Sequence, residues 1–198
     1  MMLRSLIRPL ALVAMAPLAG CISLAGKPPA MLLTLASSAS PAAGVTLDSR
    51  TARTIALQTP VTPAAIAGPR VPVMTGATSI AYVKGAVWAE PPARLFVRVL
   101  ADTLAAQAGR VVLSPQNSFG DGGARLSGEL RTFGVDAATD QAVVVFEAVL
   151  VRDGQKTIEK RRFEAREPMP VVTAAAAGLA LNRAANRVAA DIAAWVGR

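Results

Sequence analysis

The sequence predicts a single α+β domain, an antiparallel sheet with two main helices packed on one face. Three observations support this prediction. Residues 125–131 alternate between apolar and polar side chains, as a half-buried strand does, and begin a run of strand-like segments that reaches about residue 166. Two other stretches, residues 92–108 and 171–196, repeat apolar residues every three or four positions, which is the period of a helix with one buried face. The 198 residues suffice for one domain with a real core.

The chain begins with a segment that predicts a secretory leader. Arg4 and Arg8 precede an apolar run over residues 10–18, which is too short to cross a bilayer, because a spanning helix needs about 20 apolar residues. The run ends in Leu-Ala-Gly-Cys at residues 18–21, which resembles the lipobox of bacterial lipoproteins. That resemblance implies a signal peptide over residues 1–20 and acylation of Cys21 with fatty acids such as palmitate. The alternative is an ordinary secreted protein with a chance cysteine.

The residue after the cysteine bears on which membrane holds the anchor. Residue 22 is isoleucine, not the aspartate that retains many such lipoproteins in the inner membrane. The resemblance therefore points to the periplasmic face of the outer membrane in a Gram-negative bacterium. Residues 21–30 form a tether of low packing tendency, and we expect the folded domain over residues 31–198.

Strand character occurs three times before the first long helix. Residues 31–35 and 54–58 are short apolar runs, and residues 78–83 place Ile80 and Tyr82 on one face of a strand. Between the second and third of these runs, four prolines predict a stretch without regular structure, because proline lacks the N–H that a helix interior or a central strand needs. These residues are Pro60, Pro63, Pro69 and Pro72.

Residues 88–92, Trp-Ala-Glu-Pro-Pro, predict the start of the first long helix. Proline is tolerated in a first helical turn, and Glu90 lies near the positive end of the helix dipole. We expect this helix over residues 92–108, a stop at Gly109 and a short strand over residues 111–113. Its apolar stripe comprises Leu95, Phe96, Val99, Leu100 and Leu104. Three charged residues are expected to face water: Arg94, Arg98 and Asp102.

The next part of the chain predicts an antiparallel meander. Residues 120–123 indicate a turn, because Asp121 alone offers too few carboxylates for a calcium loop. The meander follows over about residues 124–166. Its middle, residues 143–152, is apolar at nearly every position, as a central strand is, and Asp153-Gly154 predicts a two-residue hairpin turn.

The chain ends in an alanine-rich helix, which we expect over residues 171–196. Its small side chains would let the helix approach a sheet closely. The apolar stripe comprises Ala174, Gly178, Leu181, Ala185, Val188, Ile192 and Trp195.

Composition excludes several classes of function. The chain has no histidine and one cysteine, which rules out internal disulfides, imidazole bases and the usual zinc sites, so we expect no catalytic residue, cofactor or metal. The formal net charge is +8, yet the arginines are scattered and aromatic residues are sparse, so we expect no nucleic acid as a partner. Lys160-Arg161-Arg162 does not make one basic patch, since a strand turns alternate residues to opposite faces, and we expect a solvated edge strand there.

The order of these motifs resembles the ABC-type transport auxiliary lipoprotein family. The resemblance rests on Tyr82, the segment 88–92, the Leu-rich helix, a strand with Leu126, Leu130 and Phe133, and the Ala-rich last helix. The chain departs from the pattern at residues 31–33, Met-Leu-Leu, where a tyrosine is expected. The resemblance implies a non-enzymatic periplasmic accessory that accompanies an ABC permease, its ATPase and an MCE-domain protein in moving lipids or other hydrophobic compounds between the two membranes.

Two aromatic residues and two carboxylates are the candidates for a role beyond packing. Tyr82 and Trp88 are candidates for docking a partner, because both residue types are enriched at interface hot spots, and packing of the strand-to-helix corner is the alternative. Two other functions stay open, a stand-alone lipid-binding carrier and, ranked last, a hydrolase that uses Glu147 or Asp191. A homo-oligomer is a further option.

Overall fold

The structure is a computed structural model that describes residues 31–117, 123–152 and 157–198. The signal peptide, Cys21 and the tether predicted from sequence lie outside the described residues, as do Asp121 and the Asp153-Gly154 turn. Residues Met31–Arg198 form one compact unit.

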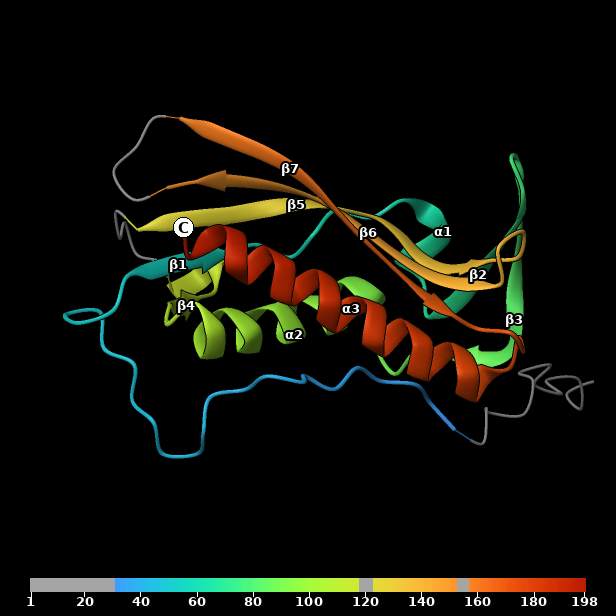
Figure 1. Cartoon of the computed structure of the whole chain (residues 1–198), viewed down its shortest axis with the longest axis horizontal. Helices are drawn as coiled ribbons and strands as arrows, with labels where there is room; N and C mark the ends of the chain where they lie inside the picture. Colours follow the sequence, from blue (N-terminus) through green and yellow to red (C-terminus); the bar gives the residue numbers. More distant parts are fainter. Residues whose placement is uncertain (1–30, 118–122, 153–156) are drawn as a thin grey trace, which may run out of the picture. The chain divides into compact units, whose positions relative to one another are not determined.

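The described residues confirm an α+β domain, which is built on a seven-stranded sheet. The two long helices, α2 and α3, lie on the same side of the sheet in Figure 1. The strands are β1 (Thr54–Leu57), β2 (Arg70–Gly76), β3 (Ser79–Val87), β4 (Val111–Leu113), β5 (Ala124–Asp136), β6 (Gln141–Val151) and β7 (Ile158–Pro168). The helices are α1 (Ala64–Ala67), α2 (Pro92–Gln107) and α3 (Ala174–Val196), with one 3₁₀ turn at Pro115–Asn117.

The long strand β5 organises the sheet. On one edge it pairs antiparallel with β6, which in turn pairs antiparallel with β7, so the predicted meander is confirmed. On its other edge β5 meets three earlier segments in succession, all parallel to it. These pairings are Ile55↔Ala124 with β1, the single bridge Val61↔Glu129, and Val73↔Val135 with β2. The sheet is therefore mixed, with β3 and β4 completing its two branches.

The proline-rich stretch is more regular than the sequence predicted. It contains the one-turn helix α1 and the strand β2, which includes the buried Pro72. The ladder between β2 and β3 shifts register between Arg70 and Pro72. On the β5 side Gly134 leaves room for Pro72, because a Cβ there would lie 2.5 Å from the Pro72 carbonyl oxygen. A register shift and a facing glycine thus admit a proline that lacks a ladder N–H.

Three element boundaries also differ from the expectation. Residues 31–35 form no strand, because only Leu33 makes a bridge, to Trp88. Helix α3 begins at Ala174 after the cap Thr173, whose hydroxyl accepts the Ala176 N–H at 3.2 Å. Strand β7 runs to Pro168, two residues beyond the expected end of the meander near residue 166.

The core lies between the sheet and the two long helices. Phe96 of α2 contacts Phe146 of β6, with ring centroids 5.4 Å apart, and Trp195 of α3 contacts Phe163 of β7 at 5.5 Å. The alanine-rich stripe of α3 is buried, as its small side chains suggested. Helix α2 ends as predicted, with Gly109 in the left-handed region at φ +58°.

Candidate functional site

An extended segment lies across the long helices and connects the domain to the residues before it. We call residues 31–47 the strap. Leu33 N–H donates to the Val87 carbonyl and Ala89 N–H donates to the Leu33 carbonyl, each at 2.8 Å. The Leu33 side chain packs on Gly178 of α3, where a Cβ would come within 2.9 Å of it. The strap is therefore attached at Leu33 to the end of β3 and lies close to α3 at Gly178.

Two asparagines of α3 hold the next part of the strap. Asn182 Oδ1 accepts the Ala36 N–H at 2.8 Å. Asn186 accepts the Ser38 N–H through Oδ1 at 2.7 Å and donates from Nδ2 to the Ala36 carbonyl at 2.9 Å. The strap thus satisfies its backbone at Ala36 and Ser38 with side-chain amides of α3, where no neighbouring strand is paired with it.

Sequence reasoning missed these asparagines. Their signal is a pair of amides four residues apart in a helix that is otherwise rich in alanine, which places both on one face. A third polar anchor comes from α2, where Asp102 accepts the Ser37 hydroxyl at 2.5 Å. Asp102 is therefore half-buried beneath the strap. The sequence had predicted that this side chain would face water.

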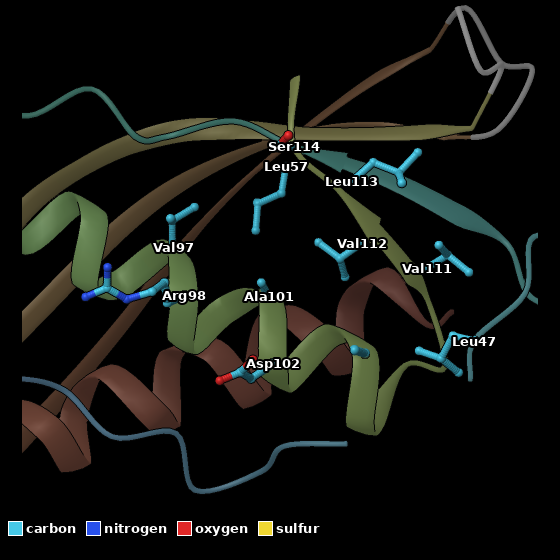
Figure 2. A pocket seen from close by; sticks show the side chains of 11 residues that line it. Leu47, Leu57, Val97, Arg98, Ala101, Asp102, Val111, Val112, Leu113 and Ser114 are labelled. Atoms are coloured by element: carbon cyan, nitrogen blue, oxygen red, sulfur yellow. The ribbon is translucent and has the colours of Figure 1, made fainter. Parts of the chain in front are cut away.

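A second feature is an open cavity of about 450 Å³ between α2 and the branch of the sheet formed by β1 and β4 (Figure 2). We call it the α2–β4 groove. Val97 and Ala101 of α2 face Leu57 and Val112 across it (Figure 2). The full lining comprises Leu47, Leu57, Val97, Arg98, Ala101, Asp102, Ala105, Val111, Val112, Leu113 and Ser114.

The charged groups that line the groove are already engaged within the chain. Arg98 donates to both carboxylate oxygens of Glu90, at 2.7 and 3.1 Å, and Asp102 accepts from Ser37. The Arg98 hydrogen bonds also hold the pKa of Glu90 below its ordinary value. Because these charges have partners, the groove offers mainly aliphatic surface, which suits an apolar chain better than an ionic ligand.

The structure separates the two aromatic docking candidates. Trp88 is 1% exposed and packs edge-on against Phe133, with ring centroids 5.5 Å apart. Its Nε1 has no hydrogen-bond partner among the described residues. Tyr82 lies on the edge strand β3, is 37% exposed and carries the Arg70 guanidinium 3.9 Å from its ring centroid. Trp88 thus packs in the core at the corner between β3 and α2. Of the two candidates, Tyr82 is the one whose side chain is accessible to a partner in this conformation.

The carboxylate candidates lie on opposite sides of the sheet. Phe146 points toward α2, so its neighbour Glu147 points to the uncovered face, whereas Asp191 belongs to α3. Lys160 Nζ lies 2.8 Å from Glu147, and this hydrogen bond lowers the pKa of the Glu147 carboxyl. Arg131 Nη1 also lies 3.5 Å from Glu147, so two cations share this carboxylate on the uncovered face of the sheet.

The basic triplet on β7 divides between the two faces, as predicted. Lys160 reaches Glu147 on the uncovered face, and Arg162 pairs with Glu164 at 2.8 Å. Arg161 lies over the Phe163 ring, 5.0 Å from its centroid, and joins Asp191 and Arg198 around a shallow polar cleft. Strand β7 pairs only with β6 in the described sheet, so its charges protect an edge.

Two further features are absent from the described residues. Within residues 31–117, 123–152 and 157–198, no three His, Cys, Asp or Glu side chains are grouped so that they could hold a metal ion. Over the same ranges, no helix combines the length and the apolar character that crossing a bilayer requires.

Comparison with known proteins identifies one family and solved structures of similar fold. The family model described as "ABC-type transport auxiliary lipoprotein component" matches residues 33–193. The crystal structure of protein XCC0632 from Xanthomonas campestris, of family DUF330, superposes with a TM-score of 0.70 at 18% identity, covering 84% of this chain and 94% of that one. An uncharacterised protein of known crystal structure gives 0.63 at 19% identity, covering 73% and 92%. No curated protein gives a significant sequence match.

Proposed function

Because the chain belongs to the family of ABC-type transport auxiliary lipoprotein components, we propose that it is a non-enzymatic accessory of a trans-envelope transport system for lipids or other hydrophobic compounds. Family membership makes it a lipoprotein of the cell envelope that associates with an ABC transport system. Our proposal adds the finer assignments. Cys21 is acylated after removal of residues 1–20, the anchor lies in the outer membrane, and the chain works with an MCE-domain protein.

One observation carries the proposal, the conjunction of a lipobox and a family match in one short chain. The match starts at residue 33, only twelve residues after Cys21. The folded part meets its tether at Met31, and the ten Cα–Cα steps from Cys21 to Met31 span at most about 36 Å when fully extended. An acylated Cys21 would therefore keep the domain close to one membrane, where two or more acyl chains make a stable anchor.

Fatty-acid labelling tests the anchor directly. Cells that express the wild-type chain are grown with a clickable palmitate analogue, and a Cys21→Ser variant is the control. We expect label and outer-membrane sedimentation in the wild type and neither in the variant. Absence of label from the wild type would refute the anchor. Mild-detergent purification from envelopes then tests the partners, since recovery without any MCE-domain protein or ABC component would refute the transport assignment.

Tyr82 supplies the proposed contact with the partner. It is partly exposed on an edge strand, beside the exposed Ile80 and beneath the Arg70 guanidinium. Tyr82→Ala should reduce co-purification of the MCE-domain protein while leaving the fold intact. The control is Ile158→Ala, which removes a more exposed apolar side chain from the distant strand β7. Equal recovery of the partner with both variants would dismiss Tyr82 as a contact.

The α2–β4 groove favours a second candidate function, that of a lipid-binding carrier. Its volume of about 450 Å³ falls within the range of small-molecule sites, roughly 300–1,000 Å³, and its lining is mostly aliphatic. Ala101→Trp would fill the groove, whereas Ala106→Trp places the same ring on the exposed side of α2. Labelled palmitate that binds the wild type and the control but not Ala101→Trp would support the carrier. A wild type that neither binds palmitate nor co-extracts lipid would reject it.

A further inference from the structure

Five exposed apolar side chains gather where the strap meets the start of α3. They are 45–66% exposed, although each would be favourable to bury. We call this group the apolar tip, and its members are Met31, Leu32, Val171, Val172 and Leu179. Single exposed apolar residues are ordinary on a protein surface, whereas a group of neighbouring exposed apolar residues is typical of an interaction site.

The contacts along α3 place these residues at one level. The strap runs in the same direction as the helix, with Leu33 against Gly178, Ala36 bonded to Asn182 and Ser38 bonded to Asn186. Two extended strap residues, at about 3.3 Å each, thus cover about the same length as four helix residues at about 1.5 Å each. Extrapolated backwards, Met31 lies about one turn before Gly178, level with the first residues of α3. Val171 and Val172 come directly before the cap Thr173 of that helix.

Behind the tip, the exposed side of α3 becomes basic. Leu179 is followed at four-residue intervals by Arg183 and Arg187, which lie on the same side of the helix. Both guanidinium groups contact the single carboxylate of Glu167, at 3.1 and 3.8 Å, so this trio keeps a net positive charge. An apolar end followed about 6 Å later by arginines matches the change from acyl chains to anionic head groups across a membrane interface.

The chain itself indicates what covers the tip. The described domain begins at Met31, a member of the tip, and only nine residues separate it from Cys21. We propose that the apolar tip inserts into the head-group region of the membrane that holds the acylated Cys21, so that the domain stands on the lipid surface with α3 pointing away from it. This inference rests on the proposed anchor, and it adds a second contact that fixes the orientation of the domain.

Fluorescence from single labelled cysteines tests the orientation. Acylation blocks the only natural thiol, so Leu179→Cys in the full acylated chain takes one environment-sensitive dye. The control is Ala194→Cys, an exposed site on the same helix, 15 residues or about 22 Å further along. In phosphatidylethanolamine–phosphatidylglycerol vesicles we expect blue-shifted emission at residue 179 and quenching by brominated lipids about threefold stronger than at residue 194. Equal weak quenching at both sites, with the protein still bound to vesicles, would overturn the tip while leaving the anchor standing.

Labelling also reports on the anchor, so the two failures are distinguishable. Two dyes on the Leu179→Cys chain would mean that Cys21 is free and that the anchor proposal fails. The tip is then tested in the Cys21→Ser background by comparing vesicle binding with and without Val171→Asp and Val172→Asp. The two chains share residues 1–30, so any contribution of that segment cancels. About tenfold weaker binding of the double-aspartate chain supports the tip, and equal binding overturns it.

Discussion

Asn186 is expected to be the main attachment of the strap, and its removal tests how the domain holds its N-terminal segment. Asn186→Ala deletes two hydrogen bonds to strap backbone, at 2.7 and 2.9 Å. A buried hydrogen bond contributes about 0.5–1.5 kcal/mol net, so the pair contributes about 1–3 kcal/mol. Alanine regains up to about 0.7 kcal/mol in helix propensity, which leaves a loss of about 0.3–2.3 kcal/mol, or roughly two- to fiftyfold in an opening equilibrium.

Amide hydrogen exchange is the assay, because it resolves individual strap residues. We expect faster exchange at Ser38, while Leu33 stays protected by its bond to the Val87 carbonyl. Asn182→Ala is the matched control, since it removes only the acceptor of the Ala36 N–H. It should speed exchange at Ala36 and leave Ser38 slow. If Asn186→Ala left Ser38 exchange unchanged, or if both variants loosened the strap identically, the assignment of these amides as separate clamps would be refuted.

Three further predictions follow from packing and charge. Gly134→Ala should lower the free energy of unfolding in urea by at least about 2 kcal/mol, because the new Cβ would lie 2.5 Å from the Pro72 carbonyl oxygen. Gly68→Ala should be neutral, because nothing lies within 4 Å of a Cβ there. Equal effects of the two substitutions would contradict the close approach of Gly134 to Pro72. Trp88→Ala should lower the free energy of unfolding by about 3–5 kcal/mol, because it empties a buried site. Trp88→Phe should lower it clearly less, because the indole Nε1 has no hydrogen-bond partner among the described residues. Thermal unfolding that ranked the two variants the other way would show that Nε1 has a hydrogen-bond partner. The third prediction concerns pH. The folded-state pKa of Glu147 is lowered, chiefly by the Lys160 hydrogen bond, so its contribution to stability is present above the ordinary glutamate pKa and is lost as pH falls through the folded value. Lys160→Met should therefore flatten the acid side of the stability profile below about pH 4.5, and an unchanged slope there would remove Lys160 as the cause.

The elements that were predicted correctly are those whose signals are local. Pro92 and Gly109 bound α2 because a fixed φ suits a first turn and a left-handed residue ends a helix. The alternation in β5 and the apolar run in β6 depend on neighbouring residues alone, and the meander joins strands that are adjacent in sequence. The family resemblance was also evident from such local motifs, and the match over residues 33–193 confirms it.

The features that escaped prediction depend on residues far apart in the chain. The strap is held by hydrogen bonds between residues that lie 146 or 148 positions apart in the sequence, and no local periodicity indicates such a pair. Pro72 lies in a strand because Gly134, on a distant strand, makes room for it. Trp88 is buried because Phe133 meets it across the core. Periodicity in a sequence specifies which face of an element is apolar, whereas the identity of the partner on that face is set by packing, which exists only once the whole chain has folded.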